Sequence, residues 1–250
     1  MNIMKKQYGA TALAYLAFLV PYTLGWSWNW WKFPAASLAI VLLMKLGDTR
    51  HYAQRLGLNF KPFLMVAAFA VFWIAGLCFD KFAVPTLQQH GYEPSRAEDS
   101  LLWKLSLLCQ AWNEEMLLRA FLLSSLARVM PGFVEGLFLA AVFAIGHLIY
   151  YAAVSPGSHF SGSAVLTLFF FFVGSNAAFY ATRSLLVPFA VHAGWNIKKF
   201  GEEWRNTATG EPLEEGASFG MVEGSFPVLV VALLFALIAH VLSVVPRGPA

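Results

Sequence analysis

Two adjacent glutamates and an arginine interrupt an otherwise apolar stretch of the sequence: Glu114, Glu115 and Arg119. Glu115 and Arg119 are four residues apart, so in a helix they share one face and can form an ion pair. Glu114 points about 100° away around the same helix and needs a different partner. Each such group costs about 2.5–3.5 kcal/mol at the centre of a membrane helix, which favours a functional role. A buried ion network that only fixes helix packing is the alternative.

Two further histidines follow along the chain, each with a neighbour four residues away: Phe143 with His147 and His192 with Asn196. Both pairs have a spacing of four, so each shares a helix face. Placing polar groups on three apolar helices in a membrane costs free energy. This cost falls only if the groups meet around one hydrated cavity. A carboxylate and an imidazole can there take a proton from water. A second imidazole and an amide can donate hydrogen bonds to the oxyanion of a tetrahedral intermediate.

These parts suit amide hydrolysis by activated water. Cys109 lies five residues before Glu114 and on a different helix face, and no Ser–His–Asp spacing is evident. We therefore expect neither a serine nor a cysteine nucleophile. The other cysteine, Cys78, also lies in an apolar run, so the two indicate neither a disulfide framework nor a metal motif.

The composition requires that these groups be placed by membrane helices. Of the 250 residues, 58% are hydrophobic and 12% are charged, whereas soluble domains carry about 25% charged residues. The mean hydropathy is +0.60. The net charge of +3 comes from scattered basic residues, which argues against nucleic-acid binding. We therefore predict an all-α protein that crosses a lipid bilayer several times.

Apolar runs long enough for a crossing predict about eight transmembrane helices in one integral-membrane domain, residues 1–250. The seventh predicted segment, residues 184–200, is short and polar, so we expect it to be helical only if it faces protein. The run Phe169 to Phe172 is expected to face lipid, and residues 80–100 and 201–224 to be aqueous linkers. The predicted segments are residues 9–26, 33–47, 62–80, 101–126, 132–154, 162–181, 184–200 and 226–245. With this arrangement, the loops on the side of the two termini contain more Lys and Arg than the loops on the opposite side, which favours cytoplasmic termini.

The three motifs together resemble those of the CPBP intramembrane proteases, the CAAX protease and bacteriocin-processing enzymes. This family includes the type II CAAX prenyl endopeptidases. The motifs Glu114-Glu115-x-x-x-Arg119, Phe143-x-x-x-His147 and His192-x-x-x-Asn196 occur in the family's order. The resemblance covers about residues 101–200, which we expect to be the catalytic core.

The resemblance implies a role for each motif residue. Glu114 would be the general base, helped by His147 in activating water. His192 and Asn196 would stabilise the oxyanion. The resemblance gives Glu115, Arg119 and Phe143 supporting places in the motifs, with Glu115 and Arg119 holding the site together. It also implies a membrane-associated peptide or protein substrate in a bacterial or archaeal cell membrane.

Other hypotheses remain open on the sequence alone. Glu114, His147 and His192 could hold a zinc ion, but no HExxH occurs, so we favour a mechanism without a cofactor. Buried Glu, His and Arg also build proton-coupled transporters, although no inverted repeat is evident. A catalytically silent scaffold or immunity protein is the third hypothesis. The sequence sets neither the substrate identity nor the oligomeric state.

Overall fold

The computed structural model describes residues 35, 37, 38, 42, 61–95, 101–123, 132–154, 161–201 and 203–244. These residues form helices and one two-stranded sheet. The first predicted crossing and most of the second lie outside the described residues. Within the described part the all-α prediction is confirmed, apart from that small sheet.

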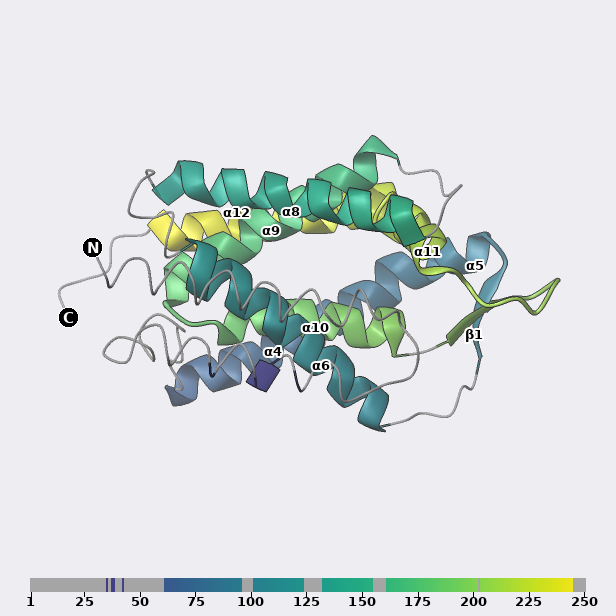
Figure 1. Cartoon of the computed structure of the whole chain (residues 1–250), viewed down its shortest axis with the longest axis horizontal. Helices are drawn as coiled ribbons and strands as arrows, with labels where there is room; N and C mark the ends of the chain where they lie inside the picture. Colours follow the sequence, from purple (N-terminus) through teal and green to yellow (C-terminus); the bar gives the residue numbers. More distant parts are fainter. Residues whose placement is uncertain are drawn as a thin grey trace.

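The long helices form two layers (Figure 1). One layer contains α8 (Gly132–Val154), α9 (Gly162–Thr182) and α12 (Phe226–Val244), with α9 packed against both others. The second contains α4 (Pro62–Cys78), α6 (Leu101–Glu115) and α10 (Leu186–Phe200), with α10 packed against both others. Contacts between α9 and α10 join the layers. The short α11 (Glu215–Val222) lies at one end of the molecule.

Among the described residues, four helical stretches are long and apolar enough to cross a bilayer: Pro62–Gln89, Val134–Ala153, Gly162–Thr182 and Phe226–Val244. The protein is therefore an integral membrane protein of α-helices. The α6 and α10 helices are present where the sequence predicts helices, but with 15 residues each they do not meet this criterion of length and apolarity. The described residues thus confirm a helical membrane protein without establishing eight crossings.

The α10 helix is largely enclosed by protein, which is the condition under which its short and polar sequence is expected to form a helix. Most of its side chains are buried, including His192, Asn196 and Lys199. Gly194 allows the closest approach to α4, because a Cβ atom there would collide with the carbonyl oxygen of Phe72. The contact places the polar face of α10 away from lipid.

The linker predicted at residues 80–100 is wrong in its first part. The helix of α4 continues through a π-helical stretch, η1 (Phe79–Ala83), into α5 (Val84–Gln89). Pro85 lies in the first turn of α5, directly after this π-helical stretch. Further along, Tyr92–Ser95 form β1, which pairs antiparallel with β2 (Glu203–Asn206) of the second linker.

Candidate active site

The acidic motif lies at the junction between α6 and the π-helical segment η2 (Met116–Leu123). Glu114, Glu115 and Arg119 are all buried. Arg119 Nη1 lies 2.7 Å from Glu115 Oε2, so the structure contains the ion pair that the spacing predicts. Glu114 points elsewhere, as its helical phase requires, and its side chain lines a cavity between the two layers.

His192 of α10 reaches across to both glutamates. Its Nδ1 lies 3.0 Å from Glu115 Oε1, and its Nε2 lies 3.7 Å from Glu114 Oε2. An ionised carboxylate only accepts hydrogen bonds, so Nδ1 carries a proton and donates it to Glu115. This contact fixes the ring and leaves Nε2 beside Glu114.

His147 of α8 completes the group from the opposite layer. Its Nδ1 lies 3.2 Å from the carbonyl oxygen of Phe143, one turn earlier. A carbonyl also only accepts, so Nδ1 is the donor, and Nε2 of the neutral ring is left as an acceptor. Glu114, His147 and His192 all line the same cavity. The structure therefore brings the two histidines and this carboxylate to one region.

Arg119 is also enclosed by aromatic rings. Its guanidinium carbon lies 4.3 Å from the centre of the Phe172 ring, a cation–π arrangement. Phe172 in turn stacks on Phe143 of the second motif, and Phe171 lies edge-on to His192. The prediction that the run Phe169 to Phe172 faces lipid is therefore wrong for its last residue, which is buried. Phe171 also lines the cavity.

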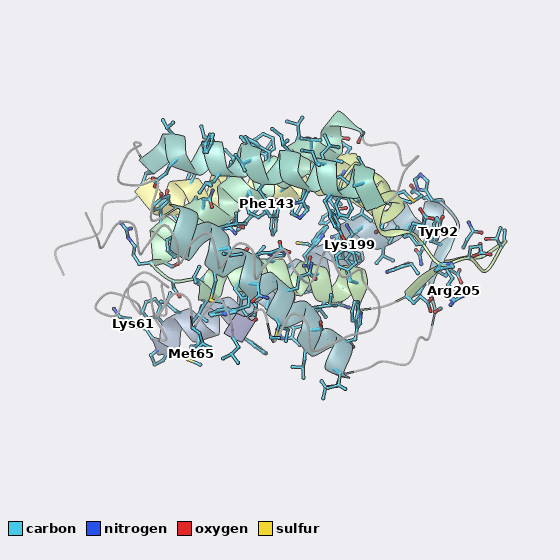
Figure 2. The ribbon with its side chains drawn as sticks, in the orientation of Figure 1. Lys61, Met65, Tyr92, Phe143, Lys199 and Arg205 are labelled. Atoms are coloured by element: carbon cyan, nitrogen blue, oxygen red, sulfur yellow. The ribbon has the colours of Figure 1, made fainter. Side chains whose placement is uncertain are left out.

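The cavity has a volume of about 420 Å³ and is bounded by mainly apolar side chains of both layers. Its polar lining includes Glu114, His147, His192 and Asn196. Asn196 is buried one turn after His192, on the same face of α10. Figure 2 shows Phe143 of one layer and Lys199 of the other lying between the layers. The structure thus brings the residues of all three motifs to this one region.

Two contributors to this site were not predicted from the sequence. Gln110 Nε2 lies 3.4 Å from Glu114 Oε1, one turn earlier on α6. Its spacing of four from Glu114 was the available signal. Phe172 gave no signal, because a buried phenylalanine within a run of four looks the same as one that faces lipid.

The proposed metal ligands Glu114, His147 and His192 do not form a ready metal site. Among the described residues, no three His, Cys, Asp or Glu side chains come together in a way that could hold an ion. As placed, Glu114, His147 and His192 therefore do not form such a group.

These features define a class of protein: a helical membrane protein with a buried carboxylate–histidine site facing an internal cavity. Residues 97–198 match the family model described as type II CAAX prenyl endopeptidase, Rce1-like. The three motifs lie entirely within the matched residues, and the family resemblance is confirmed. No curated protein and no solved structure matches the chain.

Proposed function

We propose that this protein is a glutamate-dependent intramembrane endopeptidase that hydrolyses a peptide bond of a membrane-associated peptide or protein. The observation that carries the proposal is that the adjacent carboxylates of Glu114 and Glu115 have different partners. Glu115 contacts Arg119 and the Nδ1 of His192, whereas Glu114 lines the cavity. One acid is thus engaged in holding the helices, and the other is placed where a substrate and a water molecule can enter.

In the proposed reaction, Glu114 and His147 activate a water molecule. The Glu114 carboxylate accepts a proton from the water as its oxygen attacks the carbonyl carbon of the scissile bond. The free Nε2 of His147 accepts a second hydrogen bond from the same water and orients it. The proton on Glu114 then passes to the nitrogen of the leaving amine, so that the carboxylate is regenerated when the C–N bond breaks.

His192 and Asn196 stabilise the negative oxygen that forms during this attack. With protons on both ring nitrogens, His192 donates through Nδ1 to Glu115 and through Nε2 to the oxyanion. The amide of Asn196 supplies a second donor from one turn further along α10. Preorganised donors of this kind act strongly in a cavity from which most water is excluded.

The experiment uses the full chain, purified in detergent and reconstituted in liposomes. The substrates are a peptide with a prenylated C-terminal cysteine motif and an unmodified transmembrane peptide, and the products are identified by mass spectrometry. We expect cleavage of at least one peptide by the wild type and a loss of about 10²–10⁴-fold in Glu114→Gln. Glu211→Gln, at an exposed acid of the second linker, is the matched control and should remain active.

Two results would overturn the proposal. One is equal turnover by Glu114→Gln and the wild type. The other is the absence of cleavage together with a proton-coupled flux in liposomes that Glu114→Gln abolishes, which would identify a transporter.

A further inference from the structure

A second buried charged cluster lies at one end of the same cavity, beyond the residues that match the family model. Lys199, in the last turn of α10, places Nζ 2.7 Å and 2.8 Å from the two carboxylate oxygens of Glu223. Lys199 is 4% exposed and Glu223, at the end of α11, is 5% exposed. Trp195 donates from Nε1 to Glu223 Oε1 at 3.3 Å. All three residues line the cavity.

Lys199 shares a helix face with the proposed oxyanion donors. It follows Asn196 by three residues and His192 by seven, and all three line the cavity. At a rise of about 1.5 Å per residue, Lys199 lies about 4.5 Å beyond Asn196 along the axis of α10. A contact that fixes Lys199 therefore also fixes the rotation of the helix at Asn196.

The other side of this contact reaches the opposite layer. Phe219 of α11 stacks on Tyr151 of α8, with ring centres 4.5 Å apart. Tyr151 lies one turn after His147, and their rings are 6.0 Å apart. The ammonium of Lys199 also lies over the Phe219 ring, at 5.7 Å. The α11 segment thus contacts both helices that carry the proposed catalytic histidines.

Stability alone does not explain a buried ion pair here. Removing two charges from water offsets most of their attraction, and a well-packed apolar pair is often as stable. The neighbouring pair of Lys198 with Asp80, at 2.9 Å, is by contrast 35% and 44% exposed. The buried pair instead fixes the position of α10 relative to α11. The ammonium and the carboxylate satisfy each other only in an arrangement that brings Lys199 Nζ next to both oxygens of Glu223.

We propose that Lys199 and Glu223 form a positioning ion pair that holds the cavity face of α10, with His192 and Asn196, in the geometry of the reaction. This inference rests on the proposed endopeptidase function. Neither residue touches the scissile bond; both act through α10. Loss of the pair lets the oxyanion donors shift, and a displacement of about 1 Å can cost about 10²-fold in rate.

The main test replaces the pair with neutral residues of similar size, Lys199→Met with Glu223→Gln, in the full chain. This double variant avoids a single unpaired buried charge, so we expect it to fold with the melting temperature of the wild type. Its kcat should fall by about 10- to 100-fold, with KM changed by less than about twofold, because ground-state binding is retained. The reversed pair, Lys199→Glu with Glu223→Lys, should recover much of the lost kcat. Lys198→Met with Asp80→Asn is the matched surface control and should behave as the wild type.

A second measurement does not depend on catalysis. Spin labels are attached at Ile149→Cys on α8 and Lys198→Cys on α10, with Cys78 and Cys109 replaced by Ala. We expect the distance distribution between the labels to broaden in the neutral double variant and to narrow again in the reversed pair. An unchanged distribution would overturn the proposal, as would wild-type kcat in the neutral variant. A wild type that cleaves no peptide, with the distance result as expected, would instead refute the endopeptidase function and leave the positioning of α10 standing.

Discussion

His192 hydrogen-bonds to Glu115 through Nδ1 at 3.0 Å, while its Nε2 lies 3.7 Å from Glu114. The same Glu115 carboxylate binds Arg119 through its other oxygen. One side chain of α6 therefore joins η2 to α10, and it does so without using the carboxylate that lines the cavity. The two adjacent glutamates are chemically alike but have separate environments, and this difference yields predictions that distinguish them.

Glu115→Gln should destabilise the protein, whereas Glu114→Gln should not. The first substitution leaves the buried guanidinium of Arg119 without its counter-charge. Breaking a buried pair in this way costs about 3–5 kcal/mol in the free energy of unfolding. Thermal unfolding in detergent, followed by circular dichroism, measures the difference. Equal melting temperatures for the two variants would contradict the separate roles.

His147→Ala should lower kcat by about 10²–10⁴-fold, the range expected for a group that assists proton transfer. The fold should persist, because the ring is only half-buried and its Nδ1 contacts a carbonyl of its own helix. The matched control is His90→Ala, since His90 is exposed and makes the same kind of contact with Thr86. Comparable kcat values for the two variants would exclude His147 from the reaction.

Asn196→Ala should lower kcat by about 10²–10³-fold with little change in KM, because an oxyanion donor acts mainly in the transition state. Asn196→Asp should be equally impaired, since an ionised carboxylate cannot donate. Gln89→Ala, at an exposed amide at the end of α5, serves as the control. Steady-state kinetics on one peptide substrate separate the two parameters, and a rise in KM alone would assign Asn196 to substrate binding.

Exhaustive chelation should leave the peptidase activity unchanged. Glu114, His147 and His192 do not form a metal-binding group among the described residues. The measurement compares turnover before and after dialysis against a strong chelator, with metal content determined by mass spectrometry. Activity that is lost on dialysis and restored by added zinc would overturn this prediction.

Much of the helical framework could be predicted from hydropathy, because the lengths of apolar runs reflect the bilayer. The predicted segment at residues 132–154 has the bounds of α8, and that at 226–245 differs from α12 by one residue. The extension of α4 to Gln89 could not be predicted in this way. Its charged residues Asp80 and Lys81 resemble a helix end, and the π-helical stretch that contains them leaves no mark on hydropathy.

The site was predictable where its residues share a helix, and much less where they come from different helices. Helical phase predicts the Glu115–Arg119 pair, which the structure contains. The cost of polar groups in a bilayer predicts that the motifs meet, but it does not predict that His192 contacts both glutamates. The contact of Phe172 with Arg119 depends on how α9 lies against η2, and its stacking on Phe143 depends on how α8 packs against α9. Tertiary contacts of this kind have no periodicity in the sequence.

The pairing of β1 with β2 has a consequence for how the chain assembles. Ser95 and Glu203, which hydrogen-bond to each other, are 108 positions apart, and the three motifs lie between them. Closing so long a loop is entropically unfavourable until the intervening helices have compacted it. We therefore expect the sheet to form late in biogenesis, after α6, α8, α9 and α10 have entered the bilayer. The sheet would then join the two ends of a core that is already inserted, and its formation would indicate that the core has assembled.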